Sequence, residues 1–422
     1  MLLVVADDVG RDLVSAYGLS PDAPPTPTID QLAQQGVIFA NAYAFPWCSP
    51  TRAGILTGLY PPRYFGIGRA IQVERDTEVS LPPDVLTLPR ALDRSTRWEW
   101  SHALIGKWHL TKMADGAVDA PLRHGFQRFQ GAIANLYEQH AYDGKDQNYY
   151  DWERVVDGTV ERTSTYATTQ AVDDALAVIG EMKQPWFLWL AFQTAHDPYD
   201  APPDELHSYG DLSGASVAVR SRAMVEALDR ELGRLLSSMD PEIRRNTLVI
   251  FAGDNGTDEV ALTGDLEGLP GKATVFELGV HVPLIVSGES VAQPGRVFGG
   301  LVHTNDIFAT VLDIGGVLAT HRPSEFNSVS FLPTLLNPRA PGAREVVYSE
   351  TYDPNGPGPY KYRARMLRDE RFKLIQRGNG TTSFFDLRGR IAEGPPLDVN
   401  DLEPDARAAY DRLTRRLNRG KF

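Results

Sequence analysis

Cysteine is the scarcest residue type in the chain: Cys48 is the only one among 422 residues. A single cysteine cannot close an intramolecular disulfide, so the cysteine content gives no sign of an oxidising compartment. Long apolar runs are also missing, because none could cross a bilayer and the apolar opening at residues 1–6 is too short for a signal peptide. The sequence as given therefore predicts a cytoplasmic protein without a membrane span, or a periplasmic or secreted one if a leader has been removed.

Basic residues are outnumbered, since 42 Lys and Arg stand against 55 Asp and Glu and give a formal charge of −13. A surface of that sign repels nucleic acid and anionic lipid, so we expect no nucleic-acid partner, although a local basic pocket can still bind a small anion. Hydrophobic residues at 42% and charged residues at 23% exclude a disordered chain. The length suits one large α/β domain with a smaller appendage, or two to three average domains.

Apolar runs typical of buried strands alternate with segments of helical spacing, and this alternation predicts an α/β fold. The strand candidates are residues 2–6, 37–44, 103–106, 186–192, 248–252 and 284–286. The helix candidates are residues 26–36, a helix starting near residue 48, and residues 171–182, 224–239 and 306–312. The polar and aromatic segment 131–166 has little periodicity and is predicted to be a long loop.

The composition shifts to Pro, Gly, Arg and Ala near residues 338–345, which marks a candidate domain boundary. We therefore predict a catalytic α/β domain over residues 1–340 and a small α+β subdomain over residues 341–422. Consecutive strand candidates without intervening helices predict a small antiparallel sheet in the second part, followed by an amphipathic helix. These strand candidates are residues 346–349, 364–368, 372–376 and 383–387, and the helix starts near Glu403.

Cys48 lies at a predicted helix start. A lone cysteine is usually a buried small hydrophobe, which is the simplest interpretation of this one. Pro50 and the small residues after it favour a helix that begins here, because proline is tolerated in the first turn. Free backbone donors and the helix dipole at such a position favour negative charge. Cys48 is therefore a candidate nucleophile, or a residue beside an oxyanion.

Polar residues follow several of the predicted strands. Each group taken alone has a simpler interpretation, as turn residues or as exposed side chains. In open α/β sheets, however, ligand sites lie at the carboxyl ends of the strands, so these groups can converge. The carboxylates and the amide among them form an all-oxygen set that favours Ca²⁺ or Mg²⁺ over zinc. The groups are Asp7 with Asp8, Lys107 with His109, His196, and Asp254 with Asn255. Lys107 and His109 are two apart in an extended segment and should point to the same side, so that both could face one ligand.

Residues 48–52, Cys-Ser-Pro-Thr-Arg, resemble the Cys-x-Pro-x-Arg signature of type I sulfatases, in the alkaline-phosphatase-like superfamily. The flanking segments resemble the same family in the same order over nearly the whole chain. The resemblance implies a large mixed, mostly parallel sheet between helices, with a smaller C-terminal antiparallel sheet and helix. The matching segments are residues 6–10, 26–30, 56–58, 106–109 and 254–256, and Lys272 with Glu277, Gly279 and Pro283.

The resemblance also implies that a formylglycine-generating enzyme oxidises Cys48 to Cα-formylglycine. One hydroxyl of the hydrated aldehyde attacks sulfur, and the second later expels sulfate by re-forming the aldehyde. A divalent metal acts as a Lewis acid on a sulfate oxygen. By the same resemblance, Ca²⁺ is the expected ion, with Mg²⁺ or Mn²⁺ as alternatives. The implied metal ligands are Asp7, Asp8, the modified Cys48, Asp254 and Asn255.

Roles for the other motif residues follow from the resemblance. Lys107 and Lys272 would bind sulfate oxygens, and Arg52 would orient the diol. His196 would bind the substrate and protonate the leaving alcohol, and His109 would take the proton of the second hydroxyl.

The chain departs from the family pattern in two places. His281 stands where relatives usually carry arginine, and Thr111 replaces a common glycine. We expect neither residue to contact sulfate. His124 looks structural, and the family's sulfate-binding residue from the middle loop cannot be placed within residues 131–166.

The expected activity is that of a sulfuric ester hydrolase, an arylsulfatase-like enzyme acting on a small-molecule or carbohydrate sulfate ester. Relatives with the same cysteine motif cleave phosphonate monoesters or phosphodiesters, which is the first alternative. A non-catalytic protein that binds sulfated glycans is the second, and it requires that Cys48 stays unmodified.

Overall fold

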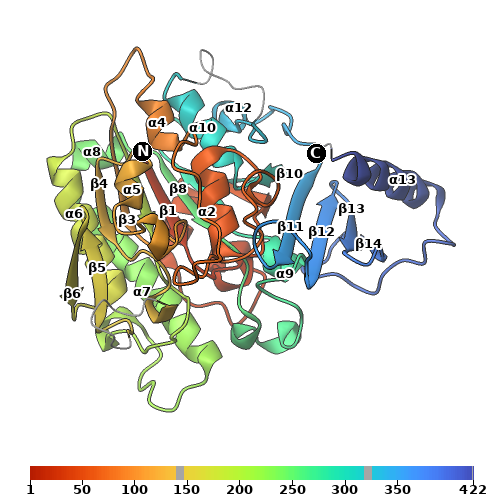
Figure 1. The fold of residues 1–422 in the computed structure, drawn as a ribbon, viewed down its shortest axis with the longest axis horizontal. Helices are drawn as coiled ribbons and strands as arrows, with labels where there is room; N and C mark the ends of the chain where they lie inside the picture. Colours follow the sequence, from red (N-terminus) through yellow and green to blue (C-terminus); the bar gives the residue numbers. More distant parts are fainter. Residues whose placement is uncertain (139–146, 318–325, 421) are drawn as a thin grey trace.

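The computed structural model describes residues 1–138, 147–317, 326–420 and 422. Within these residues the largest element is a ten-stranded mixed sheet (Figure 1). Only β9 and β5 run against the other strands, so the sheet is mostly parallel, as predicted. The strands in spatial order are β10 (Arg296–His303), β2 (Gly36–Tyr43), β9 (Leu284–Ser287), β8 (Val249–Gly253), β1 (Leu2–Ala6), β7 (Trp186–Ala191), β3 (Ser101–Gly106), β4 (Arg128–Gly131), β5 (Trp152–Val156) and β6 (Thr159–Thr163).

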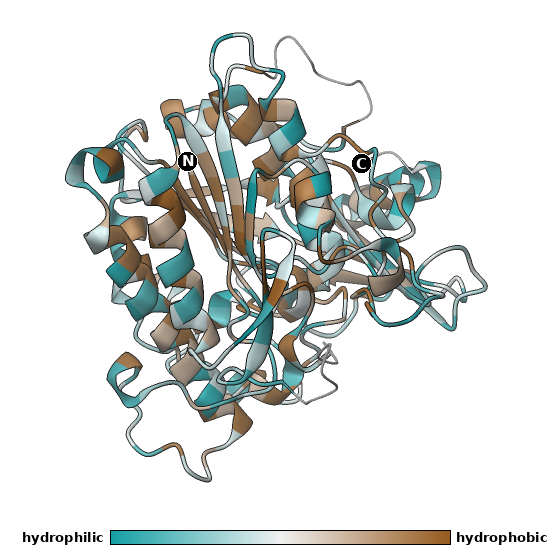
Figure 2. Ribbon diagram, turned by 60° about the vertical axis from the view of Figure 1, so that its left-hand side comes forward, coloured by the Kyte–Doolittle hydropathy of each residue, from teal (hydrophilic) through white to brown (hydrophobic). Residues whose placement is uncertain are grey.

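Helices cover both faces of this sheet, which is why its central strands are apolar throughout. Along β1 the side chains of Leu3 and Val5 pack into one core with α2, α4 and α10, and those of Leu2 and Val4 pack into another with α1, α6 and α7. In Figure 2 the central strands of the sheet are largely brown, and helices of mixed hydropathy lie beside them. The helices are α1 (Pro27–Gln34), α2 (Cys48–Thr57), α3 (Pro61–Tyr64), α4 (Leu88–Leu92), α5 (Ala120–Arg123), α6 (Ala167–Glu181), α7 (Val217–Ser238), α8 (Pro241–Arg245), α9 (Glu277–Val280), α10 (Asp306–Ile314) and α12 (Leu332–Leu336).

A second sheet of four antiparallel strands follows near the C-terminus (Figure 1). Helix α13 (Pro404–Arg419) packs on one face through Ala409, Leu413 and Leu417. The other face joins residues of the large domain, among them Tyr43, in a shared core. The predicted small antiparallel sheet and helix are confirmed, and the boundary at residue 340 stays a prediction. The strands are β11 (Val347–Asp353), β12 (Tyr362–Arg368), β13 (Phe372–Arg377) and β14 (Thr382–Asp386).

The strands and helices predicted in residues 1–317 are present, with ends that differ by up to two helical turns. The long loop predicted over residues 131–166 is wrong, because β5 and β6 form a hairpin there. Asp157 and Gly158 join these strands, and both have positive φ, at 47° and 89°. An Asp-Gly pair between strands is a strong hairpin signal. The prediction of a loop missed it because β6 is mostly polar and none of its residues is buried. Residues 139–146, also within the predicted loop, lie outside the described residues.

No helix within the described residues has both the length and the apolar character needed to cross a membrane.

Candidate active site

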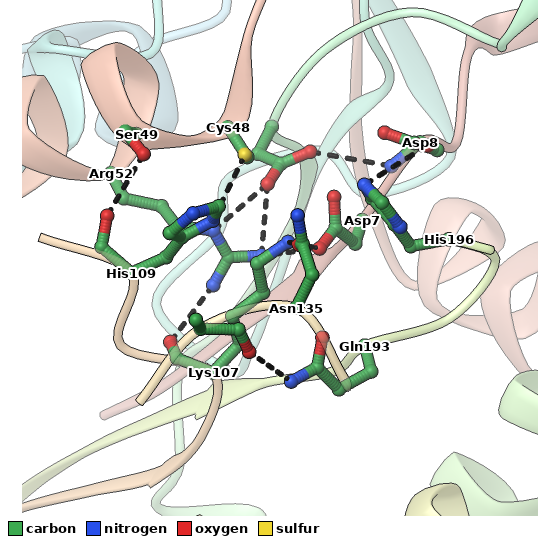
Figure 3. Close-up of polar contacts among 12 residues, drawn as sticks. Asp7, Asp8, Cys48, Ser49, Arg52, Lys107, His109, Asn135, Gln193 and His196 are labelled. Carbon is green, nitrogen blue, oxygen red and sulfur yellow. Dashed lines mark hydrogen bonds and ion pairs between the residues drawn. The ribbon is translucent and has the colours of Figure 1, made fainter. Parts of the chain in front are cut away.

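Polar side chains from four neighbouring strands meet at one edge of the large sheet (Figure 3). Strands β8, β1, β7 and β3 are adjacent and parallel, so their carboxyl ends share that edge. Asp7 and Asp8 follow β1, Lys107 follows β3, and Asp254 follows β8. His196 lies in the segment after β7. The predicted convergence of the strand-end residues is confirmed.

The acidic residues of the site are fully or almost fully buried and contact one another. The Asn255 side-chain amide donates to Asp8 Oδ1 at 2.8 Å, and the Asp8 backbone N–H donates to Asp254 Oδ1 at 3.3 Å. Within the described part of the chain, Asp7 Oδ1 and Asn255 Oδ1 are buried without a hydrogen-bond partner. Unpartnered buried oxygens are costly, and a hard cation takes such carboxylate and carbonyl oxygens as ligands. These residues therefore fit a divalent metal ion.

One possible ligand set differs from the predicted one. Asp7, Asp8 and His196 offer ligand atoms that lie within 4.8 Å of one another.

Burial, followed by the neighbouring carboxylate of Asp7, raises the pKa of Asp254 to about 8. A bound divalent cation favours the deprotonated form of such ligands. A divalent cation that binds at these carboxylates would therefore compete with a proton on Asp254.

Three buried cationic side chains face these carboxylates. Lys107 Nζ contacts Asp7 Oδ2, and Lys272 Nζ lies 2.7 Å from Asp8 Oδ2. Arg52 donates from Nε to Asp254 Oδ2 at 2.9 Å, and its Nη2 lies 3.5 Å from Asp7 Oδ2. Burial opposes the charged form of Lys272, but the carboxylate of Asp8 outweighs it and raises the Lys272 pKa well above its usual value.

Cys48 is the first residue of α2 and is buried. Its Sγ lies 3.3 Å from His109 Nδ1, and the other ring nitrogen, Nε2, lies 2.8 Å from the carbonyl oxygen of Ile71. Burial raises the pKa of the Cys48 thiol, but the charges of Lys107 and His109 and the hydrogen bond with His109 outweigh it and lower the pKa to about 6. The position therefore favours an anion.

Lys107 and His109 both belong to the site, but not for the reason predicted. We expected them to share one side of an extended segment. Strand β3 ends at Gly106, and His109 has φ of 58°, so regular alternation does not reach it. A hydrogen bond from Ser49 Oγ to the His109 carbonyl, at 2.8 Å, holds this turn against α2.

The hydrogen bonds and ion pairs of Arg52 join it to the acidic residues and to the backbone. Its Nη1 donates to the Lys107 carbonyl at 3.0 Å, in addition to the pairs with Asp254 and Asp7. The guanidinium thus fixes two carboxylates and the end of β3 together. The predicted role of Arg52 toward the diol stays a prediction.

His196 is buried beside Asp8, with Nε2 lying 3.9 Å from Asp8 Oδ2. Its Nδ1 lies 2.7 Å from Asp197 Oδ1, which directs Nε2 toward the acidic residues. Burial and then Lys272 oppose its charged form, but the carboxylates of Asp8 and Asp7 raise the His196 pKa above its usual value. Tyr137 stacks on the imidazole with ring centroids 5.8 Å apart and planes at 20°.

Two site residues, Asn135 and Tyr137, were missed in the sequence. Asn135 Oδ1 accepts a hydrogen bond from Lys107 Nζ, and both residues follow the short strand β4. They lie inside the segment in which no polar residue could be chosen. Ligand sites lie at the carboxyl ends of parallel strands, and β4 is such a strand. Asn135 would therefore have been selected if this four-residue strand had been predicted.

The contacts of His281, Thr111 and His124 involve no predicted site residue within the described chain. His281 Nδ1 lies 2.8 Å from Glu277 Oε2, and Thr111 Oγ1 accepts from the Trp108 indole at 3.1 Å. His124 Nδ1 lies 2.8 Å from the carbonyl of Ala120.

Known proteins resemble the chain over most of its length. Residues 1–317 match the sulfatase family. N-acetylgalactosamine-6-sulfatase of Homo sapiens is 30% identical over 364 residues, which cover 80% of this chain and 66% of that protein. The chain thus spans about 66% of the length of this curated relative.

Solved structures share the fold. The crystal structure of Ps i-CgsB in complex with k-i-k-neocarrahexaose is 21% identical and covers 100% of this chain and 92% of that chain, with a TM-score of 0.79. A structure in complex with its substrate D-glucosamine-2-N,6-O-disulfate is 19% identical and covers 100% and 97% of the two chains, with a TM-score of 0.74. The fold is the alkaline-phosphatase-like one. Since the family match extends over well more than half of its residues, this chain belongs to the sulfatase family.

Proposed function

We propose that the chain hydrolyses organic sulfate monoesters at the S–O bond, releasing inorganic sulfate and an alcohol or phenol. In this proposal a formylglycine-generating enzyme first converts Cys48 to Cα-formylglycine, whose hydrated aldehyde supplies the oxygen nucleophile. The observation that carries the proposal is the position of Cys48: buried at the start of α2, 3.3 Å from His109 and beside cationic side chains. Preorganised positive charge of this kind stabilises negative charge that develops in a transition state.

Lys107 and Lys272 would bind the sulfate oxygens. Each ammonium now pairs with a carboxylate, Lys107 with Asp7 and Lys272 with Asp8, and each pair is almost fully buried. Water is largely excluded there, so the attraction between an ammonium and a sulfate oxygen is stronger than in bulk water. Asn135, which also contacts Lys107, would help to orient that ammonium.

Proton transfers would fall to the two histidines. His196 would donate a proton from Nε2 to the leaving alcohol, because Nδ1 is held by Asp197 at 2.7 Å. His109 would accept the proton of the second diol hydroxyl. The C–O bond to the sulfate ester then breaks, the aldehyde re-forms and sulfate leaves, so no water molecule has to attack the covalent ester.

The expected metal is Ca²⁺, with Mg²⁺ or Mn²⁺ as alternatives. Asp7, Asp8, Asp254, Asn255 and the modified Cys48 would hold it. The unpartnered oxygens of Asp7 and Asn255 support this assignment. When bound, the ion supplies Lewis acidity toward a sulfate oxygen.

Two measurements test the proposal. Mass spectrometry of the peptide containing Cys48, from protein made in its native host, should show a loss of about 18 Da, the difference between thiol and aldehyde. Hydrolysis rates on matched aryl sulfate, aryl phosphonate and aryl phosphodiester substrates should favour the sulfate. A preference for phosphorus esters would replace the proposed activity with that alternative, and an unmodified Cys48 would favour a binding protein.

The alcohol part of the substrate is expected to contact Tyr137. Its ring stacks on His196 yet is 46% exposed, so it borders the buried site. An aromatic ring there suits an aryl group or a sugar ring, and a carbohydrate sulfate accords with the name of the human relative.

Replacing Tyr137 with alanine should raise KM for an aryl or sugar sulfate about 2- to 10-fold, with a smaller effect on kcat, because a ring contact is worth about 0.5–1.5 kcal/mol. Steady-state kinetics on both substrate types would measure this. Tyr362→Ala is the matched control, since that tyrosine is 47% exposed on β12 and should leave KM unchanged. An unchanged KM in Tyr137→Ala would remove the ring from the substrate site.

A further inference from the structure

A buried group of charged and polar side chains lies at the end of the short segment that begins with Lys272. Its centre is Glu277, the first residue of α9. Glu277 Oε1 lies 2.9 Å from Lys373 Nζ, and the same ammonium lies 2.7 Å from Glu393 Oε1. We call these three residues, with Tyr43, His281 and Arg368, the Glu277 cluster. Tyr43 donates to Glu277 Oε2 at 2.7 Å.

The Glu277 cluster joins the two sheets of the molecule. Lys373 lies on β13 of the small sheet, and Glu393 follows β14. The Glu393 carboxylate accepts the backbone N–H of Glu277 through both oxygens, at 3.0 and 2.9 Å. Lys373 is completely buried, and its ammonium lies between these two carboxylates. The small sheet therefore holds Glu277 by its side chain and by its backbone.

The segment from Lys272 to Glu277 is fixed at its other end by the active site. The Lys272 backbone N–H donates to the Thr257 carbonyl at 2.9 Å, and its ammonium lies 2.7 Å from Asp8. Ala273 N–H donates to the carbonyl of Pro46, two residues before Cys48, at 2.8 Å. Ala273 also has φ of 71°, a conformation that is unfavourable for alanine unless its surroundings hold it.

We infer that Glu277, Lys373 and Glu393 are positioning residues for Lys272, so that the small C-terminal sheet sets the affinity of the active site for sulfate. The inference rests on the proposed function in one respect, the role of Lys272 in binding sulfate oxygens. Buried ion pairs contribute little net stability when compared with apolar replacements. Net stability therefore does not explain the buried charges of the Glu277 cluster. Their role in holding the Lys272 segment in place does explain them.

The test measures binding of inorganic sulfate, not turnover, so it is independent of whether the ester is hydrolysed. Sulfate is titrated against the full-length protein, and its Kd is obtained from the rise in Tm and from calorimetry. We expect Lys373→Met and Glu393→Gln to misplace the Lys272 ammonium and to weaken sulfate binding about 10-fold. One charge-assisted contact contributes a binding energy of that size. Lys373→Arg, which keeps the charge, should retain most of the affinity.

The decisive comparison uses a Lys272→Ala background. There Lys373→Met should cause no further loss of sulfate affinity, because the group through which it acts is gone. Arg371→Met is the matched control, because Arg371 lies two residues before Lys373 in the chain. Its guanidinium also pairs with two carboxylates, those of Asp386, at 2.8 Å, and Asp405. This substitution should leave the sulfate Kd unchanged.

Three results would overturn the inference: equal losses from Lys373→Met in both backgrounds, a lowered Tm without a changed sulfate Kd, or a Lys272→Ala protein with undiminished sulfate affinity. If Lys373→Met fails to fold, Glu393→Gln carries the same comparison, because it keeps an oxygen acceptor for the Glu277 N–H. Failure of the proposed function would look different, as a wild-type protein that binds sulfate but hydrolyses no sulfate ester.

Discussion

Substituting Cys48 with alanine is expected to lower kcat for sulfate esters by about 10⁴-fold or more, the scale seen when an enzyme loses its nucleophile. Alanine can neither be oxidised to formylglycine nor supply an oxygen nucleophile. The fold should survive, because the change removes one buried sulfur atom and costs about 1 kcal/mol, typical of a small buried truncation. Turnover of an aryl sulfate and thermal unfolding, measured on the same preparation, separate the two effects.

Thr57→Ala is a suitable control for this substitution. Thr57 is buried at the far end of the same helix, where its hydroxyl donates to the Ala53 carbonyl at 2.7 Å. Its loss should affect stability modestly and leave kcat near the wild-type value. A folded Cys48→Ala protein with undiminished activity would refute the proposed mechanism.

Substituting Asp254 with asparagine is expected to weaken metal binding and activity together. The change preserves size but removes a charge that a hard cation prefers, and it also breaks the ion pair with Arg52 at 2.8 Å. We expect Ca²⁺ affinity to fall about 10- to 100-fold, the range typical of altered metal sites. Equilibrium dialysis with Ca²⁺ measures the affinity, and chelation of the wild-type protein followed by Ca²⁺ addition should remove and then restore its activity.

Asp258→Asn controls for the loss of one negative charge nearby. Asp258 caps a short 3-10 helix by accepting the Val260 N–H at 3.2 Å and touches none of the acidic site residues. Its substitution should leave Ca²⁺ affinity unchanged. An unchanged affinity in Asp254→Asn would remove that residue from the ligand set.

The sequence predicted those site residues that follow long apolar strands. Asp7, Lys107 and Asp254 follow β1, β3 and β8, and parallel neighbours must end at one edge. The same rule missed Asn135, because β4 has four residues and only one of them, Phe129, is a large apolar residue. A strand that short gives no reliable periodic signal.

Other features depend on contacts distant in sequence and could not be predicted. The turn at His109 requires a positive φ that no pattern in Lys-Trp-His indicates. The Glu277 cluster unites residues separated by 96 and 116 positions, and a lysine such as Lys373 is normally expected at the surface. The hairpin of β5 and β6 is different, because Asp157 and Gly158 did carry the signal.

The core shared by the two sheets has a consequence for how the protein unfolds. Tyr43, Val280 and Leu301 of the large domain pack in one cluster with Met366 and Ile375 of the small sheet. Unfolding of either sheet would expose the apolar side chains that the other sheet packs against. The two sheets should therefore unfold in one cooperative transition rather than two. A chain cut at residue 340 would then be a poorly folded fragment, and the predicted boundary would divide the sequence without dividing the folding unit.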